Sequence, residues 1–450
     1  MKNSFFISAL LLLHISTNCQ NKFTCYIDDP PQLKSSSCEL WNHYESTNVS
    51  STPIKTVRIT YHVFNKDDGT GNIQNDTDGL DFLDDYTDNL NLRYSQVDEM
   101  RVPSSSPHIS DSRIRFDLAE VHFWDDTNGY TYPGSYSPTW SNNLYTQFVT
   151  NKAAVTYKTT SVHIFISGGT SSSGWASGIG DRDYIVMGGI YSKYQDWLVH
   201  SWANASGLAH ELGHSLGLLH TWNGDGIDDT PNNNNCWNLN LGDPNCDELE
   251  EASNNIMDYN ASKSSLTLGQ IHRAHFYLLG RSGDIEDCVI ETISTQTPTV
   301  SGGGLVCDDG LEFQFPNIQL GVEILTSTST NITSNDCGEE VSFTPTTYTT
   351  SAESGSITFS FDYGSDGTTQ SVKNISVVGY QYENLGVCDI SSTSLISAKT
   401  INLPDTGCSS IDAVVDNGNS LSIICEEITL NSGFEVELGG TLDIQTFVCD

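Results

Sequence analysis

Basic side chains are scarce in this chain of 450 residues. Lysine and arginine together number 19, against 57 aspartates and glutamates, which gives a formal net charge of −38 at pH 7. This excess of negative charge repels phosphate backbones and anionic lipid headgroups, so nucleic acid and anionic membrane surfaces are excluded as expected partners. It suits an extracellular setting and favours binding of Ca²⁺, although solubility alone explains most of these carboxylates.

Long apolar runs are absent after the N-terminus, so no transmembrane segment is expected. Within residues 1–19, one lysine precedes a short apolar run that ends in Ser16-Thr17-Asn18. This pattern is typical of a signal peptide and predicts export. Cys19 stands where a bacterial lipoprotein carries its acylated cysteine, but the three residues before it match the usual small-residue box poorly. Simple cleavage with secretion, and anchoring at the cell surface through Cys19, both stay open.

The cysteine count predicts disulfide bonds in an exported chain. The sequence has 12 cysteines. Without Cys19 an odd number remains, so one thiol is expected to be free or to pair between chains. Cys25 with Cys38, and Cys236 with Cys246, are candidate local pairs.

Residues 210–220 carry the most informative pattern and read His-Glu-Leu-Gly-His-Ser-Leu-Gly-Leu-Leu-His. On an α-helix, His210 and His214 leave the same face about one turn apart, which suits two ligands of one tetrahedral Zn²⁺. Gly217 lets the chain leave the helix through a left-handed turn, so that His220 can return as a third ligand. The leucine- and alanine-rich flanks predict a buried helix, which argues against two surface histidines beside a solvated glutamate.

Glu211 follows the first of these histidines and reaches the open metal position, where a water molecule would lie. Zinc lowers the pKa of such a water, and a carboxylate beside it can accept the proton. The sequence therefore predicts one catalytic zinc held by the three histidines, with Glu211 as general base and then as proton donor to the leaving amine.

Strand and helix patterns alternate before the zinc motif. Residues 56–64, 114–123, 162–166 and 183–191 are rich in β-branched and aromatic side chains and predict four strands. Residues 80–96 have helical apolar spacing and lie between the first two strands, which predicts a β-α-β start to a mixed sheet.

Further motifs follow the zinc helix. Residues 220–222 read His-Thr-Trp, residues 225–231 read Asp-Gly-Ile-Asp-Asp-Thr-Pro, residues 255–259 read Asn-Ile-Met-Asp-Tyr, and residues 268–273 read Leu-Gly-Gln-Ile-His-Arg. The zinc pattern followed by a methionine turn is that of the metzincin metalloproteases. Together the motifs resemble the pappalysin-like family of this clan, which includes the cytophagalysin- and ulilysin-like enzymes, over residues 56–285.

The resemblance implies a zinc endopeptidase with protein or peptide substrates and an α+β catalytic domain, built from a mixed twisted sheet, the zinc helix and the methionine turn. It implies that Met257 forms an apolar floor beneath the metal. It also implies that Tyr259 approaches the zinc and hydrogen-bonds the tetrahedral intermediate, with simple burial as the alternative. The last strand before the zinc helix, residues 183–191, is expected to border the cleft and pair with substrate.

The resemblance also suggests a second cation. Asp225, Asp228, Asp229 and Thr230 gather oxygen atoms just after the zinc motif, and hard oxygen ligands suit Ca²⁺. The alternative is a solvated acidic turn.

The chain departs from the family pattern in two places. Some relatives carry an acidic residue a few positions after the methionine turn, which favours a basic substrate residue after the scissile bond. Lys263 lies in this stretch instead, so we expect apolar or acidic residues there. The family's inhibitory Cys-Gly segment has no clear match. Cys25 or Cys38 as an inhibitory thiolate, and a disulfide between them, are the alternatives.

After residue 285 the composition shifts to threonine, serine, glycine and valine in short alternating runs, which predicts all-β accessory domains. The glycines at 302–304 suggest a linker, and the last segment is similar to short stacked-strand repeats of secreted bacterial proteins, with a β-sandwich as the alternative. The expected divisions are a signal peptide at 1–19, an irregular leader or short propeptide at 20–55, the zinc metalloprotease domain at 56–285, a β-rich accessory domain at 286–385 and a C-terminal β-repeat domain at 386–450.

We therefore expect a secreted zinc-dependent endopeptidase that hydrolyses extracellular proteins. The alternative is a catalytically silent adhesin or carbohydrate-binding protein on a metzincin scaffold, with the β-domains carrying the function. An intact Glu211 beside all three histidines argues against it, because a silent scaffold needs no general base. No motif indicates an oligomeric state.

Overall fold

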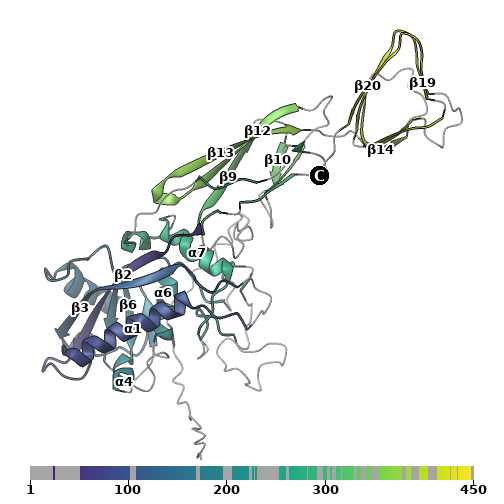
Figure 1. Cartoon of the computed structure of the whole chain (residues 1–450). Helices are drawn as coiled ribbons and strands as arrows, with labels where there is room; N and C mark the ends of the chain where they lie inside the picture. The colour runs from purple at the N-terminus through teal and green to yellow at the C-terminus, as the bar shows by residue number, and fades with distance from the viewer. Residues whose placement is uncertain are drawn as a thin grey trace, which may run out of the picture.

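The computed structural model describes most of residues 51–446 and a short strand near the N-terminus (Figure 1). The described residues are 24–25, 51–101, 108–168, 173–195, 205–221, 225–227, 229–230, 253–259, 263–280, 282–290, 297–301, 305–306, 311–315, 317–328, 332–335, 341–345, 353–377, 382–386, 395–403, 413–425, 427–432 and 434–446. None of the helices in these ranges has the length and apolar character that a membrane span requires.

One six-stranded sheet organises the first part of the chain. Its strands, in spatial order, are β1 (Thr24–Cys25), β5 (Ser173–Ala176), β6 (Tyr184–Gly188), β4 (Val162–Ile166), β2 (Lys55–Asn65) and β3 (Ile114–Asp125). All neighbours are parallel except β5, which runs antiparallel to β6. The sheet is therefore mixed, and the strands predicted at 56–64, 114–123 and 162–166 are confirmed.

The predicted strand at 183–191 is shorter than expected, and its role at an edge is wrong. β6 ends at Gly188, Gly189 has a φ of 77°, and the helix α4 (Ile190–Gln195) follows. β6 also lies between β4 and β5, so its backbone is fully paired and cannot accept a substrate strand. The physical reason for this difference is β5, a strand that the sequence did not predict. It pairs with β6 on the side away from β4.

Helices cover both faces of this sheet. On one face, α1 (Thr77–Ser95) and α6 (Ser206–Ser215) pack over inward side chains of β2, such as Ile59 and Tyr61. On the other face, α2 (Thr127–Tyr130), α3 (Pro138–Leu144) and η3 (Tyr145–Thr150) cover a smaller aromatic core that contains Phe64 and Trp175. The alternation of side chains along each strand thus supplies two cores.

The sequence explains where α1 begins and which side it buries. Asp76 caps the helix by accepting a hydrogen bond from the backbone of Gly79 at 2.9 Å. Phe82, Tyr86 and Leu90 follow at four-residue spacing and are buried, while the intervening aspartates stay exposed. This apolar stripe holds the helix on the sheet.

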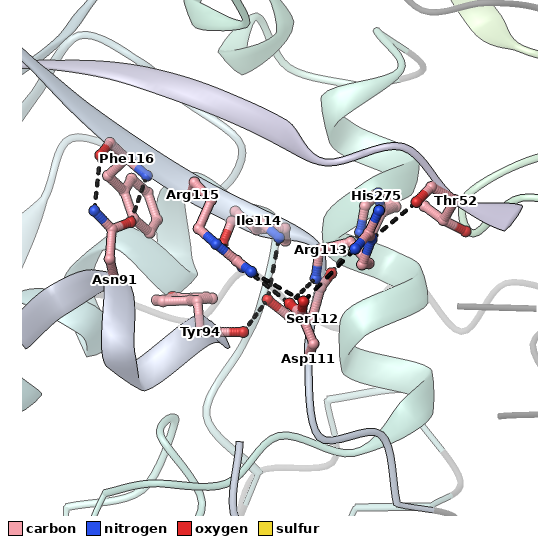
Figure 2. Close-up of polar contacts among 10 residues, drawn as sticks. All are labelled: Thr52, Asn91, Tyr94, Asp111, Ser112, Arg113, Ile114, Arg115, Phe116 and His275. Carbon is pink, nitrogen blue, oxygen red and sulfur yellow. Dashed lines mark hydrogen bonds and ion pairs between the residues drawn. The ribbon is translucent and has the colours of Figure 1, made fainter. Parts of the chain in front are cut away.

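A polar junction fixes the start of β3 between two helices (Figure 2). Ser112 donates from its hydroxyl to the carbonyl of Tyr94 in α1 at 2.6 Å, and its own carbonyl accepts from His275 Nε2 at 2.7 Å. His275 belongs to α7 (Leu268–Leu278), which follows the methionine turn. Arg113 has a φ of 60°, and its side chain donates to the carbonyl of Thr52 at 2.9 Å. The junction therefore ties α1, β3 and α7 to the segment that enters β2.

A two-sheet β-module lies against α7 (Figure 1). One sheet has the strand order β7 (Leu305–Val306), β13 (Thr368–Val377), β12 (Glu353–Asp362) and β9 (Glu323–Thr328). The other sheet has the strand order β10 (Ile332–Asn335), β11 (Val341–Pro345) and β8 (Leu311–Phe313). Phe313 and Phe359 join the sheets, with ring centroids 5.1 Å apart. The module's core is continuous with that of the first sheet. Hydrogen bonds cross the contact too, as from Ser365 N in η7 (Gly364–Asp366) to the carbonyl of Leu279 at 3.0 Å.

The last strands stack in parallel as successive coils. They are β14 (Tyr382–Gly386), β15 (Leu395–Leu403), β16 (Ala413–Val415), β17 (Ser420–Cys425), β18 (Glu427–Leu430), β19 (Phe434–Val436) and β20 (Thr441–Thr446). Ala413 pairs with Phe434 and Ser420 with Thr441, the same spacing of 21 residues in both ladders. Their apolar side chains form a core of their own.

Two cysteine side chains fall within the described residues. Cys288, in η6 (Ile285–Cys288), and Cys425 are both buried and free. Burial raises the pKa of each thiol. The pair Cys236 and Cys246 and the side chains of Cys25 and Cys38 lie outside the described residues, as do the glycines at 302–304.

Candidate metal centre

Helix α6 carries the first half of the centre deep inside the protein. His210, Glu211 and His214 all have 0% exposure. After Ser215 the helix ends, and the amide of Leu218 donates to the carbonyl of Gly213 at 2.9 Å. Gly217 has a φ of 87°, a left-handed conformation that glycine adopts without steric cost. This turn reverses the chain and brings His220 back to the helix.

The three histidines converge on one point. His210 Nε2 and His220 Nε2 are 3.2 Å apart, and His214 contributes a third nitrogen within 4.8 Å of both. Zinc–nitrogen bonds of about 2.0–2.1 Å at tetrahedral angles place ligand nitrogens roughly 3.3 Å apart. The donor set and its spacing therefore fit Zn²⁺.

Backbone carbonyls fix the tautomers of two of these imidazoles. His210 Nδ1 donates to the carbonyl of Ile256 at 2.8 Å, and His214 Nδ1 donates to the carbonyl of Leu218 at 2.8 Å. In each neutral ring Nε2 is then the atom with the lone pair. Burial lowers the pKa of His210 well below its ordinary value, and Lys263 and the other two histidines lower it further. The ring is thus held in the uncharged form that binds a metal.

The methionine turn supports the helix from below. Asn255 Oδ1 accepts from the amide of Met257 at 2.8 Å, and Asn255 is itself held by Gln270 of α7 at 2.7 Å. Met257 is fully buried, and its sulfur lies only 2.3 Å from the position that a Cβ atom on Gly213 would take. The turn and the helix therefore interlock directly beneath the histidines.

Tyr259 stands beside the histidine cluster. Its ring centroid is 5.1 Å from that of His220 and 5.7 Å from that of His210, and the side chain is partly exposed. A partly exposed phenol at this place can face both the metal position and a bound substrate.

Two residues near the centre were missed by sequence reasoning. Asp258 is fully buried and accepts a hydrogen bond from the hydroxyl of Thr221, the residue after His220. Burial raises the pKa of Asp258 to about 6, although its hydrogen bonds oppose the shift. On the other side of the centre, a Cβ on Gly174 of β5 would lie 3.1 Å from Cγ of Glu211. The adjacency of Asp258 to Met257 was the only sequence signal for either contact.

The acidic loop after the zinc motif is built into the protein by its own hydrogen bonds. Asp225 Oδ1 accepts from the amide of Ile227 at 3.0 Å and from the hydroxyl of Thr230 at 2.8 Å. Asp229 Oδ2 accepts from the amide of Gly269 at 2.9 Å, at the N-terminus of α7. Burial raises the pKa of Asp225 to about 7. Asp228 lies outside the described residues.

A second group of carboxylates lies away from this loop. Asp181, Asp183 and Asp284 are half-buried and close enough to share an ion. Arg182 bonds to Asp284 at 3.1 Å and also pairs with Asp287. The arginine offsets part of the negative charge of this group, and acidic groups of this kind are common without a bound ion.

Comparison with known proteins agrees with this geometry. No curated protein matches the chain. Residues 143–278 match the family model of the metallopeptidases described as pregnancy-associated plasma protein-A. The matched segment contains β5, β6, helix α6 with its two histidines, the methionine turn and α7. The match confirms, for residues 143–278, the predicted resemblance of this chain to the pappalysin-like metzincins.

Proposed function

We propose that this protein is a secreted zinc-dependent endopeptidase that hydrolyses peptide bonds of extracellular proteins. The observation that carries the proposal is the convergence of three buried imidazoles, with Glu211 on the same helix turn. Neutral imidazole nitrogens are ordinary ligands of tetrahedral Zn²⁺, so one ion can bind all three rings at once. Secretion rests on the signal-peptide pattern of residues 1–19, with anchoring through Cys19 as the alternative, and the N-terminal sequence of the mature protein tests it.

The residues divide the chemistry as follows. Bound zinc supplies a Lewis acid that activates water and polarises the scissile carbonyl. The carboxylate of Glu211 accepts the proton that the water loses as its oxygen bonds to the carbonyl carbon. Glu211 then transfers this proton to the nitrogen of the leaving amine as the carbon–nitrogen bond breaks. Tyr259 donates its phenolic hydrogen bond to the oxyanion of the tetrahedral intermediate.

The outer side of β5 is the place for the substrate backbone. β5 borders the centre through Gly174, and on the side opposite β6 it pairs with the two-residue strand β1, which a substrate would have to replace. An extended peptide in that position gains backbone hydrogen bonds that do not depend on its sequence. This moves the substrate-pairing role from residues 183–191 to β5.

Calcium in the loop of Asp225, Asp228, Asp229 and Thr230 remains a proposal. Its support is the oxygen-rich composition of the loop and the buried carboxylate of Asp225, whose Oδ2 has no hydrogen-bond partner among the described residues. If the loop binds calcium, the melting temperature falls when calcium is removed and zinc is retained. A melting temperature that does not change when calcium is removed would contradict the calcium proposal.

One digestion experiment separates the peptidase from a silent adhesin or carbohydrate-binding protein. The mature protein is incubated with a mixed peptide library under three conditions. The first contains no chelator, the second contains a zinc chelator, and in the third zinc is restored after chelation. We expect cleavage that the chelator abolishes and zinc restores. No cleavage by protein shown to contain one zinc per chain would contradict the proposal and favour the silent scaffold.

A further inference from the structure

Strand β5 has two faces with different surroundings. Gly174 faces the catalytic centre, since a Cβ at this position would lie 3.1 Å from Cγ of Glu211. Successive side chains of a strand point to opposite faces, so Ser173 and Trp175 point away from the centre. Trp175 is indeed part of the smaller core on the other face of the sheet.

Three aromatic side chains gather on that other face, beside β5. Tyr132, Tyr136 and Trp140, here called the aromatic platform, surround the ring of Trp175 with centroid distances of 5.4, 5.9 and 6.1 Å. Trp175 is fully buried beneath them, whereas Tyr136 is 37% exposed and the other two are partly exposed. The platform thus turns one side to the core and the other to solvent.

Hydrogen bonds hold the platform against the strand. The hydroxyl of Ser173 donates to the hydroxyl of Tyr132 at 2.6 Å, which joins the platform directly to β5. Trp140 Nε1 donates to the carbonyl of Asn128 at 3.1 Å, and Pro138 begins the helix α3 that carries Trp140. These anchors limit the conformational freedom that the rings would lose on binding a ligand.

The segment that bears the platform, from the end of α2 to the first turn of α3, has the composition of a recognition loop. Residues 130–140 read Tyr-Thr-Tyr-Pro-Gly-Ser-Tyr-Ser-Pro-Thr-Trp. Tyrosine and tryptophan give a large contact area at low entropy cost, and glycine and serine shape the loop around it, as in antibody paratopes. Simple burial of Trp175 does not require an exposed ring at Tyr136.

The outer side of β5 already receives an extended chain. Thr24 and Cys25 pair with Ser173 and Gly174 in parallel register. A substrate segment that replaces these two residues would alternate its side chains between the two faces of the sheet. Every second side chain would then point away from Glu211, toward the side on which the platform lies.

We propose that Tyr132, Tyr136 and Trp140 form a substrate subsite that binds an aromatic or proline side chain of an extended polypeptide, at a position that points away from Glu211. The proposal rests on the peptidase function proposed above and adds a substrate preference to it. Ring faces of tyrosine and tryptophan stack with aromatic rings in offset or edge-to-face geometry and pack well against proline.

The test uses the full-length, zinc-loaded protein and three variants. Tyr136→Ala removes the most exposed ring, Tyr136→Phe keeps the ring, and Ser135→Ala is a matched control at the neighbouring exposed position. Each protein digests the same peptide library, and the products are sequenced. Melting temperature and zinc content are measured for all four proteins.

We expect wild-type cleavage sites to be enriched in tyrosine, phenylalanine, tryptophan or proline at one substrate position. Tyr136→Ala should lower kcat/KM for those peptides about three- to tenfold and leave peptides without such residues unchanged. Tyr136→Phe and Ser135→Ala should match the wild type. An unchanged profile in Tyr136→Ala, no enrichment in the wild type, or an equal loss for all peptides would overturn the subsite.

A binding measurement separates this proposal from the peptidase proposal. Glu211→Gln protein, with and without Tyr136→Ala, is titrated with a tyrosine- and proline-containing peptide while tryptophan fluorescence is recorded. If the wild type cleaves no peptide, yet the peptide binds in a way that depends on Tyr136, the peptidase proposal fails and the platform stands as a binding site for peptides. Binding that does not depend on Tyr136, or Tyr136-dependent binding of oligosaccharides without binding of peptides, overturns the subsite.

Discussion

The sulfur of Met257 fills the space beside Gly213 that any larger residue at position 213 would need, 2.3 Å from the ideal Cβ position. The glycine between Leu212 and His214 is therefore a packing requirement of the metal centre. Glycine at this position lets the methionine turn approach the helix closely. The carbonyl of Ile256 in the turn can then accept the hydrogen bond from His210 Nδ1.

This contact predicts the effect of Gly213→Ala. The added methyl group should overpack the interface and lower the free energy of unfolding by about 1 to 3 kcal/mol. Zinc content should fall with it, because α6 must shift from the turn. Met257→Ala alone leaves a cavity, and the double variant should be less destabilised than the sum of the two single changes. Additive effects in chemical denaturation would show that the two side chains do not compete for space.

A buried histidine pair predicts acid sensitivity. Trp124 Nε1 donates to His62 Nδ1 at 3.0 Å, so the other nitrogen, His62 Nε2, donates to His163 Nδ1 at 3.0 Å. Burial, followed by the charges of neighbouring histidines, lowers the pKa of His62; burial lowers that of His163 to about 4. Both pKa values are thus lower in the folded protein than in the unfolded chain, where the pKa of histidine is near 6.5. The histidine pair therefore contributes its full stability above pH 6.5 and loses it as pH falls through about 4.

Between pH 6.5 and pH 4, the protonation of His163 should lower the free energy of unfolding by roughly 3 kcal/mol. The measurement is urea denaturation from pH 7 to pH 4 for the wild type and His163→Asn, which keeps one donor and one acceptor. Subtracting the two curves removes the contributions of Asp225 and Asp258, whose raised pKa values act in the opposite direction. Parallel curves would exclude the histidine pair as the source.

The shared core predicts where the chain tolerates truncation. Side chains of the β-module, such as Phe359 and Phe361, belong to the same core as α7, whereas the coils after residue 382 have a separate core. Deletion after residue 377 should leave the melting temperature of the peptidase region nearly unchanged. Deletion after residue 290 should lower it by several degrees and expose apolar surface that binds a hydrophobic dye. Equal stability of the two truncated proteins would show that the module is independent.

Lys263 predicts a charge preference. Its side chain is 1% exposed, its ammonium lies 5.9 Å from the ring centroid of Tyr259, and its charge adds to burial in lowering the pKa of His210. A cation so near the centre should disfavour arginine or lysine directly after the scissile bond and favour apolar or acidic residues. Lys263→Met should relax this discrimination. Product sequences dominated by arginine or lysine in the wild type would refute the prediction.

The sequence predicted the parts of the fold whose signal is local. The zinc helix, α1 and the first three predicted strands have strong periodicity over many residues, which tertiary packing did not override. β5 was missed because Ser173-Gly174-Trp175-Ala176 is short and its burial comes from β6 and the platform rather than from its own pattern. The end of β6 was missed because Gly189 turns the chain at a point where apolar residues continue.

The same division holds for the metal centre. The three histidines and Glu211 follow from spacing along one helix and turn. The contacts of Met257 with Gly213 and of Asp258 with Thr221 join segments far apart in the sequence, and no local pattern encodes such distances. The burial of Lys263 is also a tertiary property, since an isolated lysine in a polar stretch is usually exposed.

The role of Glu211 is tested by Glu211→Gln, measured together with zinc stoichiometry and turnover of a peptide that the wild type cleaves. The amide fills the same space but cannot accept the water's proton. We expect one zinc per chain, an unchanged melting temperature and a fall in kcat of at least about a hundredfold. Cleavage by the zinc-loaded variant at close to the wild-type rate would contradict the assignment of Glu211 as the general base.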